Sequence, residues 1–525
     1  MKSVIWRRCE MVLLGLALVA TAAAQSTLRR GAFGEPESLQ PNMSGVSSEN
    51  TILLDLFEGL TSYDAAGRLI PGAAESWRAS ADGRTWTFKL RPGLHWSDGS
   101  ALTAADFVYA LQRTMTPAVA APRATRLYVI KGAANVHRGA AAPTTLGAHA
   151  TNATTIEINL EHALPWLPWL LAGQEGFPQP QSLIERVGSN WTRAGVMISN
   201  GAFALAERAP RGAIGLRRNR YYHDAAAVAL DNVIYLPSDD TNTLLNRFRA
   251  GELDVNGWPG YPPERAAWAR QNLGAAAHAS PILGVRYLRF NVMRAPFDDA
   301  RIRLALSLAI NRDTLVGKAL GNNELVSLRV APMGIPDDNE PANNPLALGN
   351  FATRQERARQ LLIAAKYAVR HPAPITLRAP AGNNSTLCIA IAAMWGQAGV
   401  RTHLAQSEIK SMIADLRRGD FDVALTGAQD PTSYESFLNR FRATSSYNTG
   451  RYNSPAFEQA MDAAQQLADP RTRATALSRA ESILQWEQPV APLIQEIGRN
   501  LVAARVTGWV DNPIDIHLSR YLRVQ

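Results

Sequence analysis

The chain has 525 residues and a formal net charge of +9 at pH 7, with 54 Lys and Arg against 45 Asp and Glu. This length exceeds what one hydrophobic core supports, so it predicts about two to four domains. Because the charge is mild for the length and no Lys/Arg block alternates with aromatic residues, the composition argues against nucleic-acid binding.

The first 24 residues have the features of a secretory signal peptide. Lys2 belongs to a basic start, and an apolar run from Met11 to Ala20 follows, which is too short to span a bilayer. Ala22-Ala23-Ala24 then offers a small-residue cleavage site before Gln25, and no Cys stands there to receive a lipid. We therefore expect an exported, soluble chain that is cleaved near Ala24/Gln25 and is not lipid-anchored.

Cysteine usage excludes a disulfide framework. Cleavage would leave Cys388 alone, so the mature chain cannot form an intramolecular disulfide even in an oxidising compartment. Cys388 lies in an apolar stretch with helical character, and we interpret it as a small buried hydrophobic residue.

Predicted elements alternate between strand and helix along the chain. A strand from Leu28 to Phe33 precedes a helix from about Glu49 to Glu58, and residues 59–181 are rich in turns and Trp. A strand from Asn232 to Leu236 then leads into a helix from Thr241 to Ala250. The later helices are expected at Ala300 to Ala309, Gln355 to Ala365 and Leu387 to Ala398, and the later strands at Ile375 to Leu377, Arg401 to Leu404 and Phe421 to Leu425. This succession predicts a mixed α/β protein.

Residues 84–113 form the most informative stretch of the sequence. Trp86 and Phe88 alternate with polar residues, which indicates a strand with one buried face. After two turns, Thr103 can cap a helix, and Asp106 is placed to reach back to the cap. Nothing in this unit is chemically reactive, so by itself it predicts structure and not function.

The same stretch resembles the signature of the peptide-binding solute receptors of bacterial ABC importers, the oligopeptide and dipeptide class known as extracellular solute-binding protein family 5. The resemblance covers roughly residues 27–525. Further segments stand in the order and spacing of that family: Leu56 to Leu60, Pro71 to Trp77, Ser199 to Phe203, Arg218 to Tyr222, Phe248 to Asp254, Pro296 to Arg303 and Ser454 to Phe457.

The resemblance implies an α/β fold, a two-lobed type II periplasmic binding protein with an additional inserted domain. The first lobe would be discontinuous, from residues 25–58, 182–283 and 497–525. The inserted domain would span 59–181 and the second lobe 284–496. The implied function is a periplasmic receptor that binds a peptide between its lobes and delivers it to ABC importer permease subunits in the inner membrane. The resemblance also implies a monomer without a cofactor.

Asp430 is the candidate for binding the amino terminus of the ligand. A strand runs through Gly427-Ala428-Gln429 to Asp430-Pro431, which alone predicts a turn at a strand exit. In the resembling family the continuation of this strand pairs with the ligand backbone, and the following Asp binds the α-ammonium group. Ser44-Gly45-Val46 matches the first-lobe segment that supplies the opposing backbone pairs, although by itself it is a loop before a helix.

Other positions depart from the family pattern and leave alternatives open. Arg123 stands where close members have Tyr, and it could bind a ligand carboxylate or lie solvated on the surface. The motifs of common hydrolases, zinc sites and P-loops are absent from the sequence, so we expect no enzyme, no catalytic residue and no metal site. The alternatives are the same fold binding a non-peptide solute or a cell-wall peptide, a sensor without a transport role, and, disfavoured, a secreted hydrolase.

Overall fold

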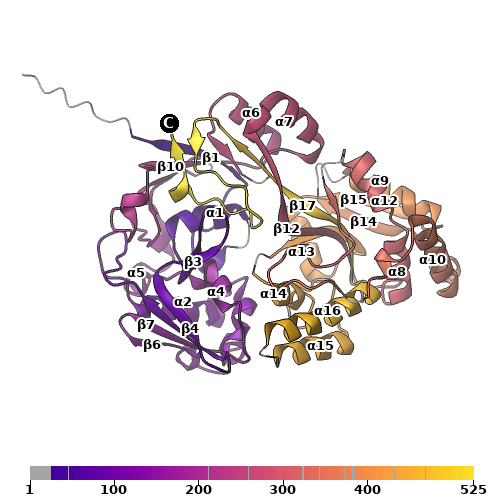
Figure 1. Cartoon of the computed structure of the whole chain (residues 1–525), viewed down its shortest axis with the longest axis horizontal. Helices are drawn as coiled ribbons and strands as arrows, with labels where there is room; N and C mark the ends of the chain where they lie inside the picture. Colours follow the sequence, from indigo (N-terminus) through magenta and orange to yellow (C-terminus); the bar gives the residue numbers. More distant parts are fainter. Residues whose placement is uncertain are drawn as a thin grey trace, which may run out of the picture.

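The chain folds into two lobes that share one 11-stranded sheet (Figure 1). The long strands β12 (Ala277–Phe290) and β17 (Val490–Val502) pair antiparallel and pass from one lobe to the other. The computed structural model describes residues 25–44, 47–210, 212–257, 259–321, 324–341, 343–371, 373–380, 385–430, 432–467 and 469–525.

On one side of this strand pair, segments far apart in sequence complete the sheet. β1 (Thr27–Phe33) pairs parallel with β10 (Asn232–Ser238), and β10 pairs antiparallel with β9 (Ile214–Arg218). β8 (Phe203–Arg208) forms the edge of the sheet. The helix α1 (Ser47–Leu56) buries Ile52, Leu53 and Leu56 in the same core as these strands.

A separate four-stranded sheet lies in the lower part of this lobe in Figure 1. Its order is β4 (Ala74–Ala79), β5 (Thr85–Leu90), β7 (Thr155–Asn159) and β6 (Ala148–Asn152), and α2 (Ala104–Met115) packs on it. These elements all belong to the segment expected to form the inserted domain.

The informative stretch folds as predicted. Trp86 and Phe88 of β5 are buried, whereas the polar residues that alternate with them, Thr85, Thr87 and Lys89, are partly or fully exposed. Thr103 caps α2, and the carboxylate of Asp106 accepts a hydrogen bond of 2.9 Å from the Thr103 backbone N–H. This reciprocal capping box satisfies N–H groups that the first helical turn leaves without partners.

The second lobe continues the large sheet in the order β15 (Thr402–Ser407), β14 (Ile375–Pro380) and β16 (Val423–Gln429), after which β12 follows. Helices cover this part of the sheet and build a second core. The main helices are α8 (Ala300–Leu308), α10 (Phe351–Ala364), α12 (Ser385–Gln397), α13 (Ile409–Arg418), α15 (Pro455–Gln465) and α16 (Pro470–Glu487). Cys388 is buried in this core, and burial raises the pKa of its thiol to about 12.

Several predicted element bounds require correction. The helix expected from about Glu49 to Glu58 is Ser47–Leu56, and the strands expected to end at Leu377 and Leu404 continue to Pro380 and Ser407. The helix expected to start at Gln355 starts at Phe351, because Asn350 caps it by accepting from the Thr353 N–H. The strand expected to end at Leu425 continues to Gln429, because β12 provides an antiparallel partner up to the pair Gly284 and Gln429. In the described part of the chain, no helix combines the length and apolar character that a membrane crossing needs.

Candidate functional site

Asp430 follows the last residue of β16 and is buried, with 3% of its surface exposed. One carboxylate oxygen accepts a hydrogen bond from the Thr432 N–H at 3.0 Å. The other accepts from the Ser436 hydroxyl at 2.9 Å, which lies on α14 (Tyr434–Asn439). The side chain is therefore held in one orientation by the first turn of the next helix.

Two arginines lie close to this carboxylate. Nη1 of Arg440 is 4.0 Å from Asp430 Oδ2, and Nη2 of Arg126 donates to the Thr432 hydroxyl at 3.3 Å. Burial raises the pKa of Asp430. The charges of Arg126 and Arg440 and the Thr432 hydrogen bond lower this pKa, and their combined effect is larger than that of burial. The net pKa lies below the ordinary value, so Asp430 is ionised at neutral pH.

Arg126 bridges Asp430 to a second buried carboxylate, Glu175. The Nε atoms of Arg126 and Arg123 lie 3.3 and 3.4 Å from Glu175 Oε1. Burial raises the pKa of Glu175, but these two guanidinium groups lower it below its usual range. Arg126 belongs to the 3₁₀ helix Ala124–Val129, so this charge cluster joins the turn-rich segment of the first lobe to the second lobe.

Among the described residues, the edge of β16 that faces away from β12 has a strand partner only at its start. β14 pairs with Val423 and Ala424, and beyond them no strand in the described part of the chain pairs with residues 425–429 on that side. Each backbone N–H and C=O on such an edge can pair with another extended chain.

The side chains of residues 427–429 are packed against or hydrogen-bonded to other parts of the protein. Ala428 is buried in the second-lobe core, and the Gln429 amide donates to Glu496 Oε2 at 2.7 Å. A Cβ atom at Gly427 would lie 3.2 Å from both Glu496 Oε1 and the Val285 carbonyl oxygen, so a side chain there would crowd its neighbours. The segment therefore offers its backbone, and not its side chains, to a ligand.

The first-lobe candidates are only partly described. Ser44 is buried, and the amide of Gln174 donates to its hydroxyl at 3.2 Å. Gln174 precedes Glu175, so Ser44 lies near the charge cluster, whereas Gly45 and Val46 lie outside the described residues. The Arg123 side chain is 30% exposed and pairs with Glu175, so it is neither fully solvated nor isolated.

Sequence reasoning missed Arg126, Glu175 and Arg440. Arg126 lies one helical turn from Arg123, and this spacing was the only feature of the sequence that could have indicated its place in the site. Glu175 and Arg440 come from distant segments, and no motif marks them.

Several contacts join the two lobes. The Thr125 and Ser446 hydroxyls are 2.9 Å apart, and they join the first lobe to the second. Other cross-lobe contacts are Trp166 Nε1 to Glu435 Oε2 at 3.3 Å, Arg473 Nη2 to the Ala163 carbonyl at 3.2 Å, and Lys410 Nζ to Glu37 Oε1 at 2.8 Å. The structure therefore has the lobes closed against each other.

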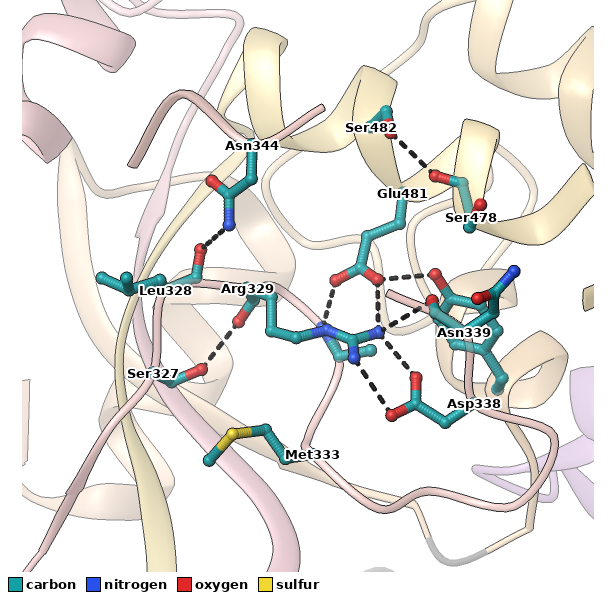
Figure 2. A network of polar contacts seen from close by, with 12 residues as sticks. Ser327, Leu328, Arg329, Met333, Asp338, Asn339, Asn344, Ser478, Glu481 and Ser482 are labelled. Atoms are coloured by element: carbon teal, nitrogen blue, oxygen red, sulfur yellow. Dashed lines mark hydrogen bonds and ion pairs between the residues drawn. The ribbon is translucent and has the colours of Figure 1, made fainter. Parts of the chain in front are cut away.

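A buried polar network contacts the start of α14. Figure 2 shows Arg329 between Asp338 and Glu481, with N–O distances of 2.7 Å to each carboxylate. The Tyr434 hydroxyl at the start of α14 donates to Glu481 at 2.6 Å, and burial raises the pKa of Tyr434 well above its ordinary value. This network fixes the helix that carries Ser436.

Known proteins resemble this chain over nearly its whole length. The family model for bacterial extracellular solute-binding proteins, family 5 Middle, matches residues 68–449. The periplasmic murein peptide-binding protein MppA of Escherichia coli K12 is 32% identical over 96% of this chain and 94% of its own length. The periplasmic oligopeptide-binding protein OppA of the same strain is also 32% identical, over 96% of this chain and 93% of its own length.

Solved structures of related proteins have the same fold as this chain, and they differ in how well their open or closed conformation matches it. The structure of the E. coli murein tripeptide binding protein MppA matches with a TM-score of 0.88 and covers 96% of this chain and 99% of that chain. Haemophilus influenzae OppA in complex with RPPGFSPFR matches at 0.87, with 30% identity and coverages of 96% and 99%. The unliganded open form of MppA reaches only 0.75, with coverages of 96% and 98%. The lower value for the open form agrees with the cross-lobe contacts of this structure.

Proposed function

Because the chain belongs to family 5 of the bacterial extracellular solute-binding proteins, we propose that it is a periplasmic receptor that binds peptides between its lobes for an ABC-type importer. Its fold is that of a two-lobed type II periplasmic binding protein, as the sequence predicted. The observation that carries the proposal is the backbone edge of residues 425–429, which no strand in the described part of the chain pairs with on the side away from β12 and which ends at the buried carboxylate of Asp430.

The proposed binding mode is strand addition. The ligand lies extended along β16 and pairs with the backbone of Gly427, Ala428 and Gln429, a mode that tolerates many side chains. Ser44, Gly45 and Val46 would pair with the opposite edge of the ligand. Asp430 would bind the α-ammonium group, because a buried ammonium without a counter-charge costs several kcal/mol.

The proposed lobe boundaries use the two crossing strands as a hinge. The divisions after residues 283 and 496 fall inside β12 and β17. Residues 25–58, 182–283 and 497–525 would then move as the first lobe, together with an inserted domain at 59–181, against a second lobe at 284–496. Ligand contacts to both lobes would stabilise the closed form.

The remaining proposals concern the cellular setting. The mature protein would begin near Gln25, without a lipid, and act as a monomer that docks on permease subunits of the inner membrane. It would bind its ligand without a cofactor and without chemical turnover, in line with the relatives, which are named as binding proteins. Intact-mass measurement of the exported protein tests both the cleavage site and the absence of a lipid. A mass that includes residues 1–24 would contradict the cleavage, and a diacylglycerol adduct would contradict the absence of a lipid.

Substitution of Asp430 tests the binding mode. Calorimetry compares the wild type and Asp430→Asn with Ala-Glu-Ala and with its N-acetylated form. Loss of the carboxylate leaves the ammonium unpaired, so we expect a cost of about 3–5 kcal/mol, which is roughly a hundredfold to several-thousandfold in affinity. Acetylation should cost the wild type a similar amount, and the two changes together much less than their sum.

The matched control is Asp313→Asn, which removes a carboxylate from an exposed position of the second lobe. It should bind the free-amino peptide as the wild type does. If Asp430→Asn also binds this peptide like the wild type, Asp430 only terminates the strand and the amino terminus is bound elsewhere.

A further inference from the structure

The buried charges around Asp430 do not balance. Three guanidinium groups face two carboxylates, and each side chain is at most 30% exposed: Arg123, Arg126 and Arg440 against Asp430 and Glu175. The cluster therefore carries an excess of one positive charge in a poorly solvated place between the lobes.

Tyr447 lies beside the same three guanidinium groups. Burial raises the pKa of a phenol, yet the pKa of Tyr447 lies below its ordinary value because Arg123, Arg126 and Arg440 stabilise the phenolate. The guanidinium of Arg440 also stacks on the Tyr447 ring, with 4.0 Å from its central carbon to the ring centroid.

Arg440 is the arginine of the cluster whose carboxylate partner is the most distant. Arg126 is engaged by Glu175 and Thr432. Within the described residues neither Arg123 nor Arg440 makes a side-chain hydrogen bond, but Arg123 is ion-paired with Glu175 at 3.4 Å. The Nε of Arg440 is buried without a partner in that part of the chain. Its nearest carboxylate oxygen lies 4.0 Å away, beyond hydrogen-bond range, on Asp430.

A peptide bound as proposed above would increase the imbalance. Its α-ammonium at Asp430 adds a second uncompensated positive charge, and a buried charge without a partner is strongly unfavourable. A carboxylate on the ligand would remove this cost and would meet an arginine fixed in position. Since Arg440 lies about 4 Å from Asp430, this carboxylate must stand close to the amino terminus of the ligand.

We propose, building on the proposed peptide receptor function, that this site selects peptides with an acidic residue at the first or second position, and that Arg440 is the specificity-determining residue that binds its carboxylate. Arg123 and Arg126 supply the surrounding positive potential. The planar guanidinium of Arg440, held against Tyr447, offers its donors to a carboxylate in a fixed geometry.

Calorimetry with matched peptide pairs tests the proposal. The pairs are Asp-Ala-Ala with Asn-Ala-Ala, and Ala-Glu-Ala with Ala-Gln-Ala, so that each pair differs only in one carboxylate. In the wild type, the acidic member of at least one pair should bind about 10- to 100-fold more tightly, the usual effect of hydrogen bonds to a charged group. In Arg440→Gln this preference should fall to within a few-fold, while the amide peptides still bind and so report an intact fold.

Arg471→Gln is the matched control, because it removes one positive charge from an exposed position at the start of α16. It should keep the full preference for the acidic peptides. Equal binding of both members of each pair by the wild type, or an unchanged preference in Arg440→Gln, would overturn the inference and leave the peptide receptor function standing. Failure of every peptide to bind the wild type would instead overturn the proposed function.

Discussion

At the scale of single residues, Glu58 joins three distant segments of the first lobe. Its buried carboxylate accepts hydrogen bonds from the Tyr222 hydroxyl at 2.6 Å and from Arg520 Nη1 at 2.7 Å. It also lies 2.6 Å from Nε2 of His223. The carboxylate therefore ties the chain after α1 to residues 222–223 and to the carboxyl-terminal segment.

Glu58→Gln should destabilise the folded protein by about 3–5 kcal/mol, because it leaves the buried Arg520 without its charged partner. Denaturant unfolding at neutral pH measures this change. Glu252→Gln is the control, since the Glu252 side chain is 54% exposed and forms a salt bridge with Arg247. A salt bridge at such an exposed position contributes less than about 1 kcal/mol to stability. Equal effects of the two substitutions would contradict a structural role for Glu58.

The same carboxylate predicts a pH dependence of stability. Burial raises the pKa of Glu58, but His223 and Arg520 lower it below its ordinary value of 4.5. Because the folded-state pKa is depressed, the stabilisation is complete above the unfolded-state pKa and is lost as the pH falls through the folded-state pKa. Below pH 4.5 the wild type should therefore lose stability more steeply than Glu58→Gln, and parallel curves for the two proteins would refute this linkage.

At the scale of elements, two glycines at the end of α12 have opposite roles. Gly396 lies within the helix, is exposed, and would place a Cβ atom in open space. Gly399 lies just beyond the helix with a φ of 83°, the left-handed conformation that terminates helices.

Gly396→Ala should raise stability by about 0.5–1 kcal/mol, because Ala has the higher helix propensity. Gly399→Ala should lower it by about 1 kcal/mol, because a Cβ atom strains the left-handed backbone. Thermal and denaturant unfolding of the two variants give the signs, and each variant serves as the control of the other. The same sign for both would show that at least one of the two mechanisms does not hold at this helix end.

At the scale of the whole molecule, the closed arrangement brings Thr125 of the first lobe within 2.9 Å of Ser446 of the second, measured between their hydroxyl oxygens. Cysteines at these two positions should form a disulfide only when the lobes close. In a protein expressed without residues 1–24 the background contains just Cys388, which is buried and has a pKa of about 12, so it should not compete.

In Thr125→Cys/Ser446→Cys, a peptide that binds should accelerate disulfide formation, because it shifts the population towards the closed form. Non-reducing electrophoresis with and without Ala-Glu-Ala follows the rate, and the single-cysteine variants should remain uncrosslinked. Small-angle scattering of the wild type should show a smaller radius of gyration with this peptide. The same crosslinking rate with and without bound peptide would argue against ligand-driven closure.

The sequence by itself determined the features that depend on neighbours in the chain. The capping box of Thr103 and Asp106 needs residues only three positions apart, and the buried face of Trp86 and Phe88 follows from strand alternation. The family segments likewise predicted the two-lobed fold, because each one can be read from neighbouring residues and together they stand in the order and spacing of the family.

Only the tertiary structure decided the composition of the charge cluster and the length of β16. Arg126 contacts Thr432 across 306 positions of sequence, and Glu175 and Arg440 reach the same place from two further segments. Strand β16 continues to Gln429 because β12 supplies hydrogen-bond partners there, which no local propensity encodes. Electrostatic balance and strand pairing depend on distances between segments, and these distances exist only once the lobes have folded and closed.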